Sequence, residues 1–338
     1  MPGEFEIIER IRRQVGPPGP GVLQGIGDDA AVLEAPGATL LASSDALVEG
    51  IHFHLSYMSP RQVGRKAMAV NLSDVGSMGG RPLFALVTLG LRRGLPEGFL
   101  DELYAGLLEM GRTHGTQVVG GDTVTSPERF FIDVAILGVP GEGPPVLRSG
   151  ARVGDRVAVT APLGASGAGL AWLLAEREER LPAGARGAAQ EAVLACVRAH
   201  LEPTPRVQAG QALAACGAVH AMMDISDGLA SEVNHVARES GVGIRVRGGD
   251  VPVAPEASEM GRLLDADPFP WALSGGEDYE LLFTYNPAAE DRVQAALAGA
   301  GLRLHVLGEV TRREEGVTLE REGQLHPLPP AGYVHLQD

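Results

Sequence analysis

The chain has 338 residues and a formal net charge of −15 at pH 7, and 44% of its residues are hydrophobic. This length indicates two domains of a globular protein. The acidic balance disfavours a nucleic acid as partner, because such binding depends on clustered Lys and Arg. No stretch approaches the roughly 20 apolar residues that cross a bilayer, and the first residues lack a secretory signal pattern. We therefore expect a cytoplasmic protein with no membrane or nucleic-acid partner.

The first part of the chain alternates between predicted helices and strands. Glycine, proline and capping residues mark their ends. The predicted helices are about 4–15, a helix that begins at Ser59-Pro60 and ends at Gly79-Gly80, and one from Pro96 to Gly115; the predicted strands are near 30–34, 39–44, 84–91, 117–122 and 130–139.

A domain boundary is expected at residues 140–155, the stretch richest in Gly and Pro. It separates a domain of residues 1–140 from one of residues 141–338. The elements predicted beyond it are strands at 156–161, 218–223, 243–248, 279–285 and 304–311, a helical tract at about 166–200 broken at Leu181-Pro182, helices at 205–215, after 228 to Gly241 and up to about 299, and a hairpin at 317–326.

Acidic residues recur beside Gly or Ser, mostly where an apolar run ends or a helix begins. Any one of them alone is best explained as a cap or turn residue. Asp74 is the exception, because it lies well inside a predicted helix, where Asp is a poor helix former. Asn71 lies on the same helical face. The acids are Asp28, Asp29, Asp45, Asp74, Asp122, Asp224 and Asp227.

Oxygen ligands from separate loop ends, next to small residues, are what Mg²⁺ chemistry on phosphates requires. Calcium is the structural alternative, but the spacing matches no EF-hand loop. A Walker P-loop is excluded because the only lysine, Lys66, follows Arg65 and belongs to no Gly-Lys-Ser/Thr stretch. The acids therefore predict a magnesium site without a P-loop.

Seven segments, in this order, closely resemble the thiamine-monophosphate kinase family of the aminoimidazole ribonucleotide synthetase-like superfamily: GIGDDAAVL, SSDALVEGIHF, AVNLSDVGSMGGRP, VVGGDT, LRSGARVGD, DISDGLASE and LSGGEDYELLFT. The resemblance covers nearly the whole chain. It implies an α/β (α+β type) fold of two domains, whose N-terminal domains pair across their sheets into a homodimer and whose C-terminal domain closes the cleft. The implied reaction is direct transfer of the γ-phosphoryl group of ATP to thiamine monophosphate.

The resemblance also implies a role for each motif residue. Asp74, Asp122 and Asp227 are expected at the reaction centre, and Gly121, Asp122, Arg148 and Ser226 at the nucleotide. Asp28 is expected to be structural or to lie in the outer shell of the metal. The expected ligands of several Mg²⁺ ions are Asp29, Ser43, Ser44, Asp45, Asp74, Asp122, Asp224 and Asp227.

Three residues are expected to contact thiamine monophosphate: His52, Glu277 and, near the C-terminus, an aromatic. Pro330 stands where the family has that aromatic, so Tyr333 is the substitute we predict. Without the motifs, His52 would be interpreted as a structural histidine and Glu277 as part of a turn. A zinc site at His52 and His54 is discounted, because no cysteine or third histidine lies nearby.

The same motifs are also compatible with other functions. A sister enzyme such as aminoimidazole ribonucleotide synthetase would use similar acids on a similar fold. Selenophosphate synthetase and the hydrogenase maturation factor are disfavoured, because cysteine is lacking near the N-terminus and in the tail. A catalytically silent metal- or nucleotide-binding protein is the alternative from another class, and it would not need the complete set of acids.

Overall fold

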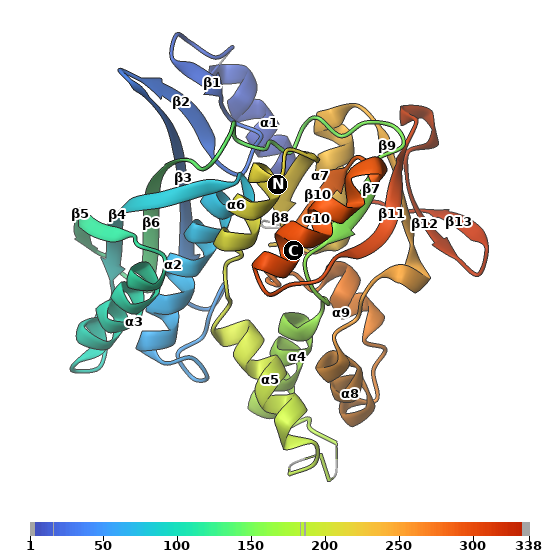
Figure 1. Ribbon diagram of the computed structural model, residues 1–338. Coiled ribbons are helices and arrows are strands. Elements are labelled where there is room, and N and C mark those ends of the chain that lie inside the picture. The colour runs from blue at the N-terminus through green and yellow to red at the C-terminus, as the bar shows by residue number, and fades with distance from the viewer. Residues whose placement is uncertain (1–3, 16, 183, 186, 333–338) are drawn as a thin grey trace.

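Two β-sheets, each with helices packed on it, organise the chain in the computed structural model (Figure 1). The structure describes residues 4–15, 17–182, 184, 185 and 187–332. Most strand pairs in both sheets are antiparallel, and each sheet contains one parallel pair. The fold is the mixed two-domain arrangement that the sequence predicts.

The first sheet has six strands in the order β1-β2-β3-β6-β4-β5. Its parallel pair, β4 and β5, is joined through α3, whereas the other neighbours are antiparallel. The elements of this domain are α1 (Glu4–Val15), β1 (Val22–Gln24), β2 (Ala31–Ala35), β3 (Ala38–Val48), α2 (Pro60–Ser77), β4 (Gly80–Leu91), α3 (Phe99–Thr113), β5 (Gln117–Thr125) and β6 (Phe131–Pro140).

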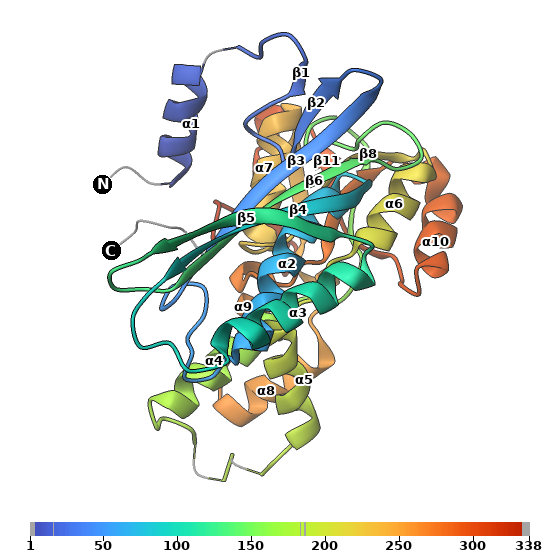
Figure 2. The ribbon, with the colours of Figure 1, turned by 90° about the vertical axis from the view of Figure 1, so that its left-hand side faces the viewer.

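Helix α2 begins where the sequence predicts, because Ser59 caps it. The Ser59 side chain accepts from the backbone N–H of Gln62, the Gln62 side chain accepts in return from the N–H of Ser59, and Pro60 occupies the first turn. The helix packs on the first sheet with α3, and it also contacts β8 and α6 of the second domain. Residues of α2 are therefore placed between the two domains (Figure 2).

The second sheet has seven strands in the order β13-β12-β9-β11-β7-β10-β8. Strand β8, which ends at Asp224, lies at one edge and pairs with β10, with Leu281 opposite Asp224. The elements are β7 (Arg156–Val159), α6 (Val207–Ala215), β8 (Val219–Asp224), α7 (Leu229–Ser240), β9 (Gly243–Arg247), β10 (Leu281–Tyr285), α10 (Glu290–Gly299), β11 (His305–Thr311), β12 (Val317–Arg321) and β13 (Gln324–Pro327), with short 3₁₀ turns at Gly248–Asp250, Pro287–Ala289 and Arg313–Glu315.

Four helices form a lobe with its own small core, which extends away from the second sheet (Figure 1). They are α4 (Ala165–Arg177), α5 (Gln190–Leu201), α8 (Pro255–Leu264) and α9 (Phe269–Ser274). No element was predicted for residues 250–278, so α8 and α9 were not expected. Their apolar residues pack mainly on α4, α5 and α7, and such contacts are not visible as a local signal.

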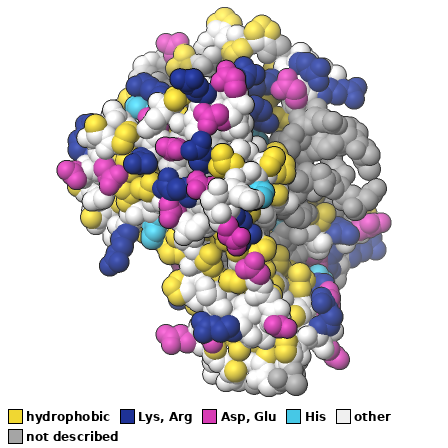
Figure 3. Space-filling view, turned by 90° about the vertical axis from the view of Figure 1, so that its right-hand side faces the viewer, with side chains coloured by type: hydrophobic (Ala, Val, Ile, Leu, Met, Phe, Trp, Pro, Cys, Tyr) yellow, Lys and Arg dark blue, Asp and Glu magenta, His cyan; other side chains and the backbone are white. Residues whose placement is uncertain are grey.

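Large apolar side chains remain exposed on the first sheet. Phe84 and Leu86 of β4, Val119 and Val124 of β5, and Leu137 of β6 are each at least 37% exposed. Exposed large apolar side chains on neighbouring strands are typical of an interaction site. On the face shown in Figure 3, by contrast, basic and acidic side chains are interspersed. Within the described part of the chain, no helix is long and apolar enough to cross a membrane.

Candidate active site

A cavity of about 580 Å³ lies between the two domains and is lined by residues of both. Most of the residues that the sequence singles out meet there, although they come from segments far apart in the chain. The predicted site residues that line the cavity are Asp29, Ser43, Ser44, Asp45, His52, Asp74, Arg148, Asp224, Ser226, Asp227 and Glu277.

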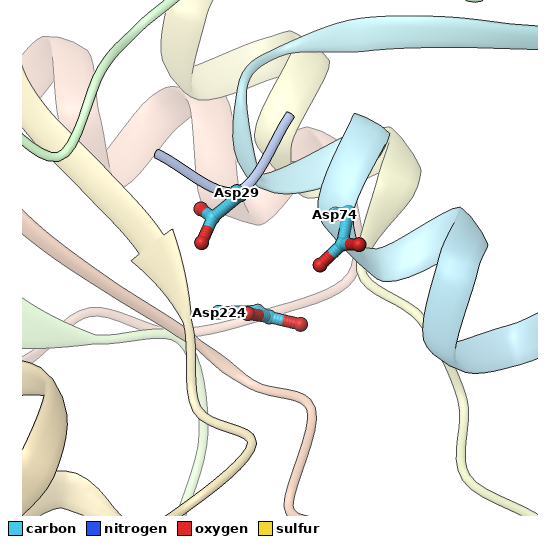
Figure 4. A group of neighbouring side chains, drawn as sticks. All are labelled: Asp29, Asp74 and Asp224. Carbon is cyan, nitrogen blue, oxygen red and sulfur yellow. The ribbon is translucent and has the colours of Figure 1, made fainter. Parts of the chain in front are cut away.

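Three buried carboxylates form the centre of this site. Asp29 comes from the loop before β2, Asp74 from α2 and Asp224 from the end of β8, and one oxygen of each lies within 4.8 Å of the others. Their side chains point into a common space (Figure 4). The three acids therefore join both domains at a single point.

Serine hydroxyls from the same segments orient these carboxylates. Ser77 donates to Asp29 Oδ2 at 2.6 Å, Ser73 donates to Asp224, and Ser43 donates to Asp74. Because Ser73 and Ser77 belong to α2, this one helix reaches the acids of both domains.

The electrostatics of the cluster favour a bound cation. Burial and then the charges of Asp45 and Asp224 raise the pKa of Asp74 well above its usual range. Burial and then the charge of Asp29 raise the pKa of Asp224 to about 8. Carboxylate and hydroxyl oxygens brought together in this way fit the hard-ligand preference of Mg²⁺.

Arg148, which also lines the cavity, places a guanidinium at the cluster. Its Nε donates to Asp29 Oδ1 at 2.7 Å, and its backbone N–H donates to Asp28 Oδ2 at 3.1 Å. Asp28 thus holds the Arg148 segment, in agreement with the structural role predicted for it. The position of Arg148 at the acidic cluster leaves its predicted contact with the nucleotide untested.

Ser44 and Asp45 lie on β3 beside the cluster. The Asp45 N–H donates to Asn71 Oδ1 at 3.0 Å, so the polar residue that shares a face of α2 with Asp74 fixes the β3 backbone. Ser44 donates to Asp133 Oδ1 on β6 at 2.9 Å. Asp133 was not predicted as a site residue; its only signal in the sequence is that it is an acidic residue within an apolar strand.

The Ser226–Asp227 loop is held by Glu232, a residue that the sequence analysis missed. Glu232 Oε1 accepts from the N–H of Ser226 at 3.1 Å and from that of Asp227 at 2.8 Å, and Glu232 is only 1% exposed. Gly276 packs on this loop so closely that a Cβ would lie 2.7 Å from the Ser226 carbonyl oxygen. This packing explains why Glu277 follows a glycine with φ of +67°.

Glu277 also lines the cavity and lies between two basic side chains, one of which, Lys66, is eight residues before Asp74 on α2. Its Oε1 is 2.6 Å from Lys66 Nζ, and its Oε2 is 3.0 Å from His200 Nδ1. Burial opposes ionisation of Glu277, but Lys66 and His200 outweigh it and lower the pKa to about 2. His52 lines the cavity nearby, and its Nδ1 accepts from the Val48 N–H at 3.0 Å.

Lys66 and His200 were not predicted as site residues. Lys66 was considered only as evidence against a P-loop. Its position as the one lysine in a largely apolar helix could have indicated that its side chain is buried. His200 gave no sequence signal, because only the packing of α5 brings it to Glu277.

Two predicted residues are not among those that line this cavity. Asp122 lies exposed on β5, with one carboxylate oxygen accepting from the Thr123 N–H at 2.8 Å. Gly121 has a local structural explanation, because a Cβ there would lie 1.8 Å from the Val87 carbonyl oxygen of β4. The roles predicted for Gly121 and Asp122 at the nucleotide and the metal stay predictions.

The predicted contact from Tyr333 falls outside the described residues. Gly332, the last one described, packs against the Asp227 carbonyl so closely that a Cβ would lie 2.1 Å from its oxygen. The described chain therefore ends next to the cavity, whereas Pro330 is exposed.

Known proteins share this fold over nearly the whole chain. Residues 27–140 match the family of the AIR synthase related protein, N-terminal domain, and residues 152–320 match its C-terminal domain. The thiamine-monophosphate kinase of Salmonella typhimurium is 36% identical over 335 residues, and that of Aquifex aeolicus is 38% identical over 333 residues; each comparison covers 98% of both chains.

Solved structures agree with these relatives. The structure described as "AaThiL complexed with AMPPCP and TMP" has a TM-score of 0.83 at 36% identity and covers 99% of this chain and 97% of that chain. The hydrogenase maturation protein HypE of E. coli has a TM-score of 0.67 at 23% identity, covering 96% of this chain and 98% of that one, and this likeness concerns the fold alone.

Proposed function

Because the chain belongs to the thiamine-monophosphate kinase family, we propose that it transfers the γ-phosphoryl group of ATP to thiamine monophosphate, giving thiamine diphosphate and ADP. The observation that carries this proposal is the buried cluster of Asp29, Asp74 and Asp224 at a cavity between the domains. A relative of the same fold, solved with AMPPCP and TMP, supports the two substrates.

We propose that the acidic residues hold several Mg²⁺ ions. The bound ions would neutralise charge on the phosphates of both substrates, which otherwise repel each other. Asp74 is the central ligand in this proposal, because it contacts or faces acids of both domains. The ligands that line the cavity are Asp29, Ser43, Ser44, Asp45, Asp74, Asp224 and Asp227.

The protein's own part in the transfer is to position the reactants. The attacking group is a phosphate oxygen, largely ionised near neutral pH, so no side chain has to remove a proton from it. Arg148 and Ser226 are proposed to bind the nucleotide, with Asp227 beside the reacting phosphates. His52, Glu277 and Tyr333 are proposed to hold the organic part of thiamine monophosphate.

We further propose a homodimer formed through the exposed apolar face of the first sheet, which includes Phe84, Leu86 and Val119. Asp122 and Gly121 lie on β5, an edge strand of that sheet. Their proposed roles at the nucleotide and metal require an assembly in which β5 approaches a cavity. The oligomeric state of the wild type and of Leu86→Glu, measured by light scattering, tests the interface: the variant should be monomeric.

We place the protein in the cytoplasm. Cys196 and Cys216 are both free, and unpaired cysteines suit a reducing compartment.

The proposed activity is tested by mixing the purified protein with ATP, Mg²⁺ and thiamine monophosphate and analysing the products by chromatography and phosphorus NMR. We expect magnesium-dependent thiamine diphosphate with an equal amount of ADP. Parallel samples contain free thiamine or formylglycinamidine ribonucleotide. Turnover of the ribonucleotide without thiamine diphosphate would contradict the proposal and favour a sister enzyme of the same fold.

A further inference from the structure

Lys66 is the only lysine of the chain, and it is 0% exposed. Its Nζ lies 2.6 Å from Glu277 Oε1 and donates to the His52 carbonyl oxygen at 3.4 Å. Lys66 therefore contacts both residues proposed to bind the organic part of the substrate. The ion pair of Lys66 and Glu277 also joins the two domains, since Lys66 belongs to α2 and Glu277 follows α9.

The second oxygen of Glu277 is held from another direction. His200 Nδ1 lies 3.0 Å from Glu277 Oε2 and 3.2 Å from Ser166 Oγ, and His200 is 3% exposed. Burial and, to a smaller extent, the charge of Glu277 raise the pKa of Tyr57, which belongs to a neighbouring segment. The carboxylate therefore has a basic partner on each oxygen.

The backbone at Glu277 is fixed as well. Its N–H donates to the Ser226 carbonyl oxygen at 2.6 Å, and its φ is +56°, which a residue with a Cβ seldom adopts. Next to it, Asp278 accepts from the Gly164 N–H at 3.0 Å and so ties the segment to the start of α4. Such a strained and fully bonded segment is typical of a functional site.

From this geometry we propose that Lys66 is a positioning residue for the substrate: with His200 it holds Glu277 ionised and in one orientation towards the organic part of thiamine monophosphate. The proposal rests on the proposed function. It extends that function, because Lys66 itself does not line the cavity.

Helix α2 also links the contact between Lys66 and Glu277 to the acidic cluster. Lys66 and Asp74 are eight residues apart on α2, which corresponds to about 12 Å along the helix axis. One rigid element thus sets the distance between the carboxylate at the organic end and the acids at the phosphate end. A substrate must reach both ends to react, so α2 contributes to selection by length.

A purely structural ion pair is the alternative, and a double-mutant cycle separates the two roles. The variants are Lys66→Met, Glu277→Gln and the double variant, with KM for thiamine monophosphate, KM for ATP and kcat measured for each. We expect Lys66→Met to raise KM for thiamine monophosphate at least 10-fold, with KM for ATP changed less than 2-fold. In the Glu277→Gln background, the same substitution should change KM for thiamine monophosphate less than 2-fold.

Arg65→Met is the matched control, because Arg65 is the neighbouring cation on α2 and pairs instead with Glu109. It should leave every kinetic constant within 2-fold of the wild type. Folding is checked by thermal denaturation. Where Lys66→Met unfolds, the double variant, which removes both charges of the pair, is compared with Glu277→Gln alone, and a difference in KM for thiamine monophosphate above 2-fold would refute the positioning role.

The outcomes separate the two proposals. Failure of the wild type to make thiamine diphosphate would refute the proposed function. An active wild type in which Lys66→Met affects KM equally with and without Glu277, or changes only thermal stability, would refute the positioning role alone.

Discussion

Asp74 and Glu277 are carboxylates of the same cavity, but their surroundings differ. Asp74 is surrounded by other acids, and burial together with Asp45 and Asp224 raises its pKa well above the usual range. The Glu277 side chain is 24% exposed, and Lys66 and His200 lower its pKa to about 2 against the opposing effect of burial. Among the described residues, basic side chains supply the counter-charge for Glu277, whereas the charges that act on Asp74 are those of other acids.

This difference indicates how the two ends of the cavity work. A group of acids with little internal counter-charge is ready to bind a cation, because binding relieves their repulsion. A carboxylate already paired by the protein stays ionised without a ligand and can serve as a fixed contact. The four predictions below test the contrast.

The largest effect is expected for Asp74→Asn. The substitution removes a central charge from the proposed metal ligands, so kcat should fall by about 100- to 1,000-fold or more. The fold should survive, since neutralising one member of a crowded acidic group relieves repulsion. Product formation measures kcat, and thermal denaturation without Mg²⁺ measures the stability of the fold. Normal turnover would show that Asp74 has no part in the mechanism.

Glu277→Gln should have the opposite effect on stability. It leaves the Lys66 ammonium buried without its counter-ion, which costs about 3 kcal/mol in the free energy of unfolding. Urea unfolding at pH 7 measures the loss. The contrast between the two ends fails if Glu277→Gln is as stable as Asp74→Asn.

The decrease in the free energy of unfolding at acidic pH should also depend on Glu277. Its pKa in the folded protein, about 2, lies below the ordinary value of 4.5, so its contribution is full above pH 4.5 and is lost as the pH falls towards 2. Between these values the wild type should lose about 2 kcal/mol more than Glu277→Gln. Parallel unfolding curves for the two proteins would contradict this expectation.

The smallest expected effect is the stabilisation of the folded protein by Mg²⁺. Mg²⁺ at ten times its dissociation constant should raise the free energy of unfolding by about 1.4 kcal/mol, because it binds only the folded protein. Asp74→Asn should lose most of this gain, and Lys66→Met should keep it. Thermal melts over a Mg²⁺ titration make the comparison, and an equal gain in both variants would argue against a cation at the acidic cluster.

Much of the fold was predictable because its signals are local. Ser59 and Pro60 predicted the start of α2, and the alternation of apolar runs with Gly and Pro predicted most strands. The helices α8 and α9 were missed because their burial depends on the lobe that they form with α4 and α5. The domain boundary placed at residue 140 stays a prediction.

The site was predictable only in part. The motifs indicated Asp29, Asp74 and Asp224, and the structure brings them within 4.8 Å of one another. Asp122 was indicated by the same kind of motif, but it lies exposed on β5. A motif identifies a residue type and its neighbours in the sequence, and it does not specify where in the folded protein that residue lies.

The sequence by itself determined the residue types of the site, the oxygen-rich chemistry and the family, because these reside in short contiguous motifs. Only the tertiary structure decided which charges are compensated. Lys66 and Glu277 are 211 residues apart, and their pairing depends on α2 lying between the two domains. Whether a carboxylate is a fixed contact or a site for a cation depends on such distant neighbours, because the electrostatic energy of a buried group is set by what surrounds it in space.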